Sequence, residues 1–195
     1  VRPRHNKVLI IGMKKTYLVT KDIVETLERK MKYQLNEEFK IYIRSLENQF
    51  LTAFWQSVPN ECEKIAIDAS SVSLELDSII SQENYPVVSL DRVYFTTADE
   101  YLEVTRITDQ KTGEIKISER PGNKPLDEQI AYLKRYSKIV LTDVGAFEGK
   151  TLLKVCDLLE REGINIEAIY LGFSSTKANN RISKTRKITA LNLFD

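Results

Sequence analysis

Residues 138–172, which read KIVLTDVGAFEGKTLLKVCDLLEREGINIEAIYLG, decide the fold that the sequence predicts. Residues 138–143 form a short apolar run, typical of a strand that is buried on both faces of a sheet. Residues 149–162 place apolar side chains along one side at helical spacing, and Gly163 ends that helix. Residues 166–172 form a second apolar run. A strand, a helix and a strand in this order indicate a right-handed crossover between two parallel strands.

The same alternation of strand and helix patterns extends through most of the chain. Residues 101–120 depart from it, because two β-branched segments flank a polar turn at residues 109–113, as in a β-hairpin. The predicted fold is therefore α/β, a mostly parallel sheet with helices on both faces, interrupted by this hairpin. The sequence predicts further strands at residues 7–12, 39–43, 64–69, 86–95 and 188–193, and further helices at residues 20–34, 47–58, 71–81 and 125–137.

The composition excludes several kinds of site. Of the 195 residues, 42% are apolar and 29% are charged, and the formal net charge is +1, so a nucleic-acid role would need a local basic patch. The single histidine, His5, and the widely separated Cys62 and Cys156 cannot build the common zinc sites or most histidine-dependent catalytic arrangements. No apolar run is long enough to span a membrane and no secretory leader opens the chain, so we expect a cytoplasmic protein with reduced thiols.

The loop that follows residues 138–143 is the segment best suited to bind a ligand, because ligands collect beyond the carboxyl ends of parallel strands. Asp143 stands at the strand end, and Gly145 and Gly149 free the backbone of the loop. A Lys-Thr pair then opens the helix, where unpaired amides and the helix dipole favour an anion. We interpret this loop as a phosphate-binding turn. The structural alternative is an ordinary tight turn between a strand and a helix.

The loop differs from the P-loop of nucleotide hydrolases, whose motif is G-x-x-x-x-G-K-[ST]. Here only three residues separate Gly145 from Gly149, instead of four. The loop also lies late in the chain, with about one strand left after its helix. A P-loop protein is therefore the less favoured interpretation.

The residues around the loop resemble a different family, the type I phosphoribosyltransferases. Residues 139–143 and 149–152 resemble the strand end and helix start with which that family holds the 5-phosphate and ribose of phosphoribosyl pyrophosphate (PRPP). Residues 65–76 resemble its earlier strand, loop and helix, which contact the pyrophosphate. The resemblance spans roughly residues 64–174, and within it residues 101–120 correspond in order to the family's flexible loop.

This resemblance implies a role for each candidate residue, with Asp143 as the catalytic residue that holds the ribose hydroxyls. It implies Mg²⁺ as the companion of PRPP, transfer of phosphoribose to a base, and no dedicated metal ligands in the protein. From the residues alone, Arg92 is expected to pair with neighbours, and Tyr170 and Phe173 to lie in the core. The resemblance assigns the phosphate and ribose to Thr142, Gly145, Ala146, Gly149, Lys150 and Thr151, and the pyrophosphate to Ser70 and Ser71. The functional alternatives for the other candidates are pyrophosphate binding by Arg92 and base stacking by Tyr170 and Phe173.

Departures from the family pattern leave a second function open. Thr142 takes the place of the first of two acids, and Glu148 brings a negative charge into the loop. Residues 1–60 have no counterpart, so we expect them to form an N-terminal α/β extension packed on a core of residues 61–195. The alternative to a PRPP-binding transferase is a non-catalytic binding or assembly domain of a larger protein, and a homodimer or a multidomain assembly stays open. The basic residues 177–187 are expected to be a solvated loop, with nucleic acid as their alternative partner.

Overall fold

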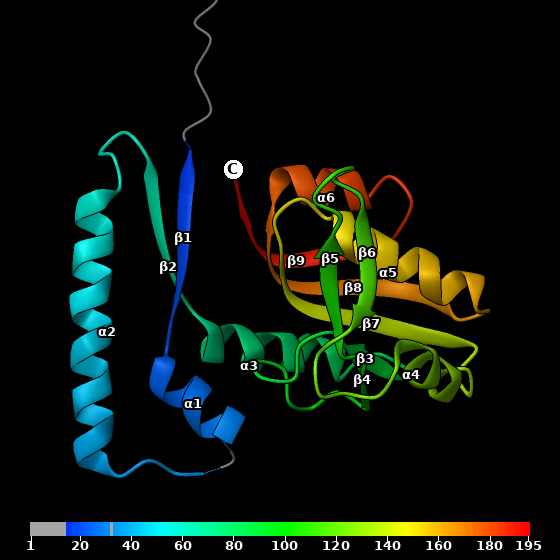
Figure 1. Ribbon diagram of the computed structural model, residues 1–195, viewed down its shortest axis with the longest axis horizontal. Helices are drawn as coiled ribbons and strands as arrows, with labels where there is room; N and C mark the ends of the chain where they lie inside the picture. Colours follow the sequence, from blue (N-terminus) through cyan, green and yellow to red (C-terminus); the bar gives the residue numbers. More distant parts are fainter. Residues whose placement is uncertain (1–14, 32) are drawn as a thin grey trace, which may run out of the picture.

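The computed structural model describes residues 15–31 and 33–195, which form a main sheet with its helices and a smaller N-terminal unit beside it (Figure 1). The strand expected at residues 7–12 and His5 lie outside the described residues. Within the described part of the chain, no helix is both long and apolar enough to cross a membrane.

The main sheet has five strands in the order β4-β3-β7-β8-β9, and every neighbouring pair in it is parallel. This confirms the predicted mostly parallel α/β fold. The long central strands are those with the strongest apolar runs, because both of their faces are buried. The strands are β3 (Val87–Ser89), β4 (Glu100–Tyr101), β7 (Lys138–Ala146), β8 (Asn165–Ser175) and β9 (Ile188–Phe194).

Helices cover both faces of this sheet, as the sequence predicts. On one face, α4 (Leu126–Leu133), α5 (Lys150–Arg161) and α6 (Thr176–Ile182) bury their apolar sides against alternate residues of β7 and β8. On the other face, α3 (Ala69–Ile80) packs against the intervening residues of the same strands. Because successive strand side chains point to opposite faces, β7 and β8 contribute side chains to two separate apolar layers.

The N-terminal unit contains a two-stranded parallel sheet of its own, formed by β1 (Thr16–Lys21) and β2 (Glu63–Asp68). Two helices, α1 (Ile23–Met31) and α2 (Glu37–Ser57), connect these strands. The expected boundary after residue 60 falls inside this unit, because β2 pairs with β1 and not with the main sheet. The chain passes directly from β2 into α3 and so into the main sheet.

The strand predicted at residues 39–43 is wrong, because these residues lie inside α2, which also begins ten residues before the helix predicted from residue 47. The side chain of Asn36 accepts a hydrogen bond from the Phe39 amide at 2.8 Å and so caps the helix. Two acids in the first turn suit the positive end of the helix dipole. These local signals outweigh an apolar alternation of only five residues.

Two other segments differ from their predictions, whereas the hairpin is confirmed. The strand predicted at residues 86–95 ends at Ser89, because the Asp91 carboxylate accepts hydrogen bonds from the Val93 and Tyr94 amides and turns the chain. Residues 177–187 are not all loop, since α6 begins at Thr176 and the Ser175 side chain caps it. The hairpin consists of β5 (Val104–Thr108) and β6 (Ile115–Glu119) in antiparallel register.

Candidate functional site at the carboxyl edge of the main sheet

The predicted phosphate loop is shorter than the sequence indicates. Strand β7 continues to Ala146, so Gly145 and Ala146 are strand residues paired with β8 and only residues 147–149 lie between β7 and α5. A Cβ on Gly145 would lie 2.0 Å from the Phe173 ring. Gly145 is therefore explained by the close approach of this ring, and it does not form the anion-binding nest that was expected.

Asp143 is half-buried and lies within β7, three residues before its end, where the sequence analysis expected the strand to end. Its Oδ1 accepts a hydrogen bond from the Val144 amide at 2.8 Å. Burial, followed by the nearby Asp91 carboxylate, raises the pKa of Asp143 to about 7, while the Val144 hydrogen bond and Arg120 act in the opposite direction. Near neutral pH, Asp143 is thus present in both protonation states.

Thr142 does not share this cleft. Its side chain is fully buried, and its Oγ1 has no hydrogen-bond partner among the described residues. Successive side chains of a strand point to opposite faces, so Thr142 lies on the α3 side of the sheet, while Asp143 lies on the α5 side. The placement separates Thr142 from the ligand position that the family resemblance implies.

Asp91 supplies the second acid at this edge, and the sequence analysis did not assign it to the site. Leu90 donates its amide to the Thr142 carbonyl at 2.9 Å, which continues the β3–β7 pairing just past Ser89 and brings Asp91 near Asp143. An acid directly after a strand adjacent to β7 was the available signal. That signal was missed because residues 90–95 were assigned to a strand.

Arg92 is held by protein groups close to this edge. Its Nε lies 2.8 Å from the Glu103 carboxylate, and its guanidinium stacks over the Tyr101 ring at 4.6 Å from the ring centre. Arg120 contacts the other oxygen of Glu103 at 3.3 Å. The pairing expected from the residues is present, and the pyrophosphate role stays a prediction.

The start of α5 combines a left-handed glycine with converging cations. Gly149 has a φ of 70°, and the helix N-terminus has no side-chain cap. The Glu148 carboxylate lies 2.8 Å from Lys150 Nζ and 3.4 Å from Lys177 Nζ, while Arg181 donates to the Glu148 carbonyl. Lys150, followed by Lys177, lowers the pKa of Glu148. Lysines from two helices therefore meet beside uncapped amides.

The aromatic rings are arranged differently from the expected base-stacking pair. Tyr170 and Phe173 are both buried in the layer beneath α3, and the Tyr170 hydroxyl donates to Glu83. Their placement agrees with the core role expected from the residues alone and leaves neither ring open to a base. Phe147 is the exposed ring of the loop, and it contacts Phe173 and Phe194 edge-on at centroid distances of 5.8 and 5.7 Å.

The expected pyrophosphate position at the start of α3 is already filled by carboxylates. Asp68 Oδ1 accepts the amides of Ser70 and Ser71, each at 3.1 Å. Asp22 Oδ2 accepts the Ser70 amide at 2.9 Å and its hydroxyl at 3.1 Å. Burial raises the pKa of Asp22. Two acids thus satisfy the amides that a pyrophosphate would need, and their charge opposes a second anion.

The basic residues of the C-terminal segment are matched by acids. Arg186 lies 2.9 Å from Asp157 and 2.7 Å from Glu160, and Lys177 meets Glu148. These pairs hold α6 and its following turn against α5. The placement favours the solvated structural role over a nucleic-acid patch.

Comparisons with known proteins give only distant likenesses. No protein-family model matches the chain, and no curated protein matches it. An adenine phosphoribosyltransferase from Thermoanaerobacter pseudethanolicus is 11% identical, with a TM-score of 0.44 over 65% of this chain and 80% of its own. An orotate phosphoribosyltransferase from Aeropyrum pernix is 14% identical, with a TM-score of 0.43 over 65% and 73%. A Mycobacterium tuberculosis orotate phosphoribosyltransferase, in complex with PRPP, has a TM-score of 0.39 at 10% identity, covering 65% of this chain and 73% of its own. These TM-scores are too low to assign a family, so the function rests on the site itself.

Proposed function

We propose that this protein binds a phosphorylated ribose at the carboxyl edge of the main sheet. The phosphate would lie at the N-terminus of α5, and the ribose hydroxyls would meet the carboxylates of Asp143 and Asp91. The observation that carries the proposal is the start of α5, where Lys150 and Lys177 converge on one carboxylate beside a helix end without a side-chain cap.

Glu148 supports this position for the phosphate, because its carboxylate already lies between the two lysines. All three side chains are well exposed, so the ion pairs are held weakly and exchange readily with solutes. A phosphate carries more charge than the carboxylate and more acceptor oxygens, and it can also accept from backbone amides. It is therefore expected to displace Glu148 from the lysines.

The carboxylates at the edge support the ribose position. Asp143 in β7 and Asp91 after β3 come from adjacent strands, and the charge of Asp91 acts on Asp143. Vicinal hydroxyls of a ribose donate hydrogen bonds well to such a pair. Asp91 would thereby supply the second carboxylate, because Thr142 stands where the family pattern has its first acid.

The start of α3 favours binding over group transfer. A transferase would have to hold the departing pyrophosphate, but Asp22 and Asp68 occupy the corresponding amides of Ser70 and Ser71. The proposal therefore includes a phosphorylated ribose and excludes a dedicated pyrophosphate position. This makes the non-catalytic alternative the favoured one.

The proposal assigns no protein ligands to Mg²⁺. No cluster of three or more acids, cysteines or histidines within the described residues is arranged to hold a metal ion. Asp91 and Asp143 also each accept hydrogen bonds from nearby backbone amides. Mg²⁺ bound by the phosphates of a ligand would need few protein ligands, so no step is assigned to it.

Isothermal titration calorimetry with ribose 5-phosphate, ribose and PRPP with Mg²⁺ tests the proposal. We expect ribose 5-phosphate and PRPP to bind with affinities within about tenfold of each other, a difference of about 1.4 kcal/mol, and ribose to bind much more weakly. Lack of binding by either phosphorylated compound would refute the proposal. A PRPP affinity far above that of ribose 5-phosphate would restore the pyrophosphate position.

Two lysines of α5 allow a matched comparison of ligand binding, in which Lys150 is tested and Lys154 is the control. Lys150→Gln removes one cation from the phosphate position and should weaken ribose 5-phosphate binding severalfold. Lys154 lies one turn further along α5 and donates to the Ile115 carbonyl of the hairpin. Lys154→Gln should leave the binding affinity unchanged, which separates the local contact from the general effect of a lost positive charge.

A further inference from the structure

We propose that α2 is the contact surface of a homodimer, in which it pairs antiparallel with α2 of a second copy. This proposal is independent of the ligand site. It starts from an apolar surface on α2, here called the α2 stripe, which consists of Phe39, Tyr42, Leu46 and Phe50. The exposed fractions of these four side chains are 41%, 57%, 41% and 53%.

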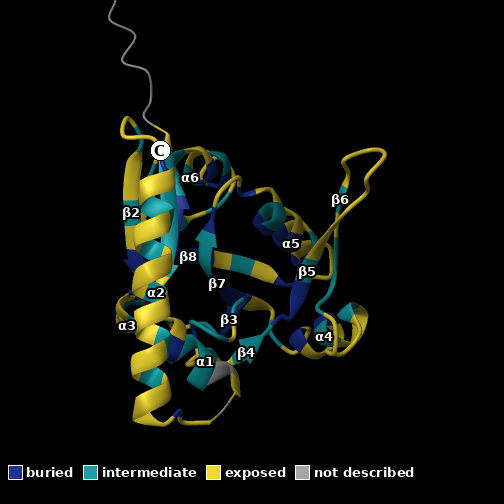
Figure 2. Ribbon diagram, turned by 60° about the vertical axis from the view of Figure 1, so that its left-hand side comes forward, coloured by how far each residue is buried: buried dark blue, intermediate teal, exposed yellow. Residues whose placement is uncertain are grey.

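The rest of the protein uses a different side of α2. Phe54 contacts the Tyr17 ring of β1 at 6.5 Å, and the Glu47 carboxylate accepts the amides of Asp22 and Ile23 at the start of α1. None of the residues of α2 is fully buried. The helix lies at the outside of the molecule, mostly exposed along its length (Figures 1 and 2).

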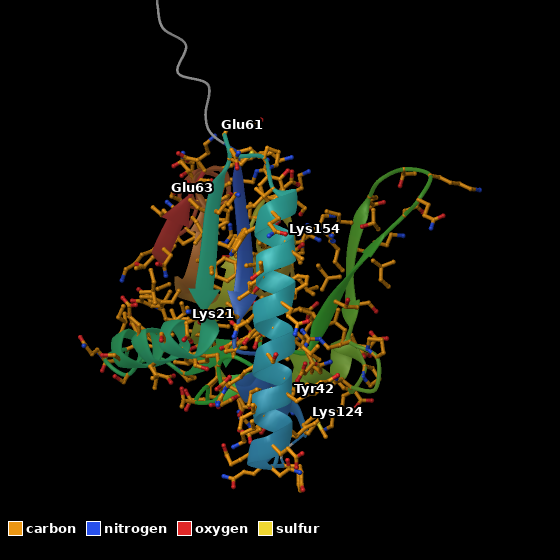
Figure 3. The ribbon with its side chains drawn as sticks, turned by 90° about the vertical axis from the view of Figure 1, so that its left-hand side faces the viewer. Lys21, Tyr42, Glu61, Glu63, Lys124 and Lys154 are labelled. Carbon is orange, nitrogen blue, oxygen red and sulfur yellow. The ribbon has the colours of Figure 1, made fainter. Side chains whose placement is uncertain are left out.

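The α2 stripe is continuous along the helix and open to another molecule. Its residues are spaced by three, four and four positions, which places them on one side of the helix. Figure 3 shows α2 with no other helix or strand in front of it and with Tyr42 labelled on it. Exposed aromatic side chains in a continuous row are typical of protein contact surfaces.

The arrangement of the stripe is self-complementary, which selects a second copy as the occupant. If two α2 helices pair antiparallel about a two-fold axis at Leu46, Leu46 meets its own copy and Tyr42 meets Phe50. The same pairing places Phe39 opposite the small Ala53. At about 100° per residue, all of these side chains lie within about 40° of Leu46 around the helix. Large side chains thus face small ones at the ends, and rings face rings beside the centre.

The helix dipoles favour the antiparallel direction. The first turn of α2 carries Glu37 and Glu38, and its last turn has no basic residue. At that last turn, Lys64 of β2 donates to the Trp55 carbonyl at 2.7 Å and adds a positive charge. Antiparallel pairing aligns the two helix dipoles favourably. Glu37 is already paired with Lys40 of the same helix at 3.0 Å, so the direction rests on the dipoles and on the pairing of the stripe. Parallel pairing would place the two helix dipoles side by side in the same direction, which is unfavourable.

The size of the surface indicates a weak dimer. A helix of 21 residues is about 30 Å long, and one helix pair alone lies at the lower end of the area of specific interfaces. We therefore expect a dissociation constant in the micromolar range, roughly 1–100 µM. Dimerisation should accordingly depend on protein concentration.

Analytical ultracentrifugation over a range of concentrations measures this equilibrium. The wild-type protein should shift from monomer to dimer, and Leu46→Glu, which places two like charges at the axis, should weaken the dimer at least tenfold. Ile41→Glu is the matched control, because Ile41 is 67% exposed on another side of the same helix and should leave the dimer unchanged. A protein that is monomeric at every concentration, or a dimer that Leu46→Glu does not weaken, overturns the proposal.

Cysteine cross-linking tests the geometry separately. In a Cys62→Ser background, which leaves only the buried Cys156, Leu46→Cys should form a disulfide-linked dimer on mild oxidation, because the axis brings the two positions together. Ile41→Cys in the same background should stay monomeric under the same conditions. Equal cross-linking of both variants would contradict the antiparallel arrangement, and circular dichroism melting curves check that each variant is folded.

Discussion

Asp143 is the residue whose charge is most sensitive to the fold, and this sensitivity predicts a pH effect. Its pKa is raised from 3.8 to about 7, so the folded state keeps a proton that the unfolded chain releases. Stability should therefore fall as pH rises from about 4 to about 7. Asp143→Asn cannot release a proton, so it should be more stable than the wild type at about pH 8 and similar to it at about pH 4, with a relative change of about 4 kcal/mol.

Urea denaturation of both proteins at several pH values measures this difference. Asp91→Asn provides the control. Removing the neighbouring charge should lower the pKa of Asp143, so the unfolding free energy should fall by less between about pH 4 and about pH 7. If the wild type and Asp143→Asn keep a constant difference in unfolding free energy across this pH range, then Asp143 is not held protonated by the fold.

Glu148 competes with the proposed ligand for the same two lysines. Glu148→Gln removes the negative charge but keeps the size of the side chain, so Lys150 and Lys177 become available to a phosphate. We expect the affinity for ribose 5-phosphate to rise severalfold, and calorimetry at low and high salt measures it. Because the gain is electrostatic, it should shrink at high salt. A weaker affinity would show that Glu148 helps to shape the site.

Gly149 at the start of α5 combines a left-handed backbone conformation with a close contact to α6. Gly149 has a φ of 70°, and a Cβ there would lie 3.1 Å from the Ile182 side chain of α6. Gly149→Ala should cost about 1–2 kcal/mol from the backbone conformation alone, with an added cost because Ile182 must move. Gly163→Ala at the other end of α5 is the control, since it also has a positive φ but nothing within 4 Å.

Thermal melting of the two variants separates these effects. The larger loss of stability should belong to Gly149→Ala, and that variant alone should also weaken ribose 5-phosphate binding. Equal losses for both variants would mean that α6 yields freely and that the contact with Ile182 contributes nothing.

The elements that could be predicted from sequence are those whose apolar pattern is long. Strand β7, helix α5 and strand β8 each carry an uninterrupted pattern, so their type and order were predicted correctly. Residues 39–43 were predicted wrongly because the helix signal comes from Asn36 outside the segment. In the candidate site, Asp143 was singled out because an acid follows an obvious apolar run, although β7 continues to Ala146. Asp91 was missed because its strand is only three residues long and turns through hydrogen bonds that the sequence does not reveal.

The tip of the hairpin has little support from the rest of the described structure. The hairpin extends away from the main sheet in Figure 2, and its two strands pair only with each other. Its base is held by the Arg120 amide, which donates to the Glu103 carbonyl, and by Lys154 of α5. We expect amide hydrogen exchange at residues 108–114 to be much faster than in β7, by about 100-fold or more, because local opening costs little there.

Hydrogen exchange followed by mass spectrometry measures both segments in one sample. Slow exchange at residues 108–114 in dilute protein would contradict this expectation. The same experiment at high protein concentration serves as a check, since protection that appears only there would assign the hairpin tip to a contact between copies.

The separate pairing of β1 with β2 has a consequence for synthesis on the ribosome. The N-terminal unit has all of its strands once Asp68 has emerged, whereas the main sheet lacks its central strand until residue 146 is made. Domains fold as units while the chain is still growing from its N-terminus. The N-terminal unit can therefore close first, and the helix that carries the α2 stripe would be exposed on nascent chains before any ligand site exists. Two ribosomes on one message would then be close enough for their growing chains to meet through α2.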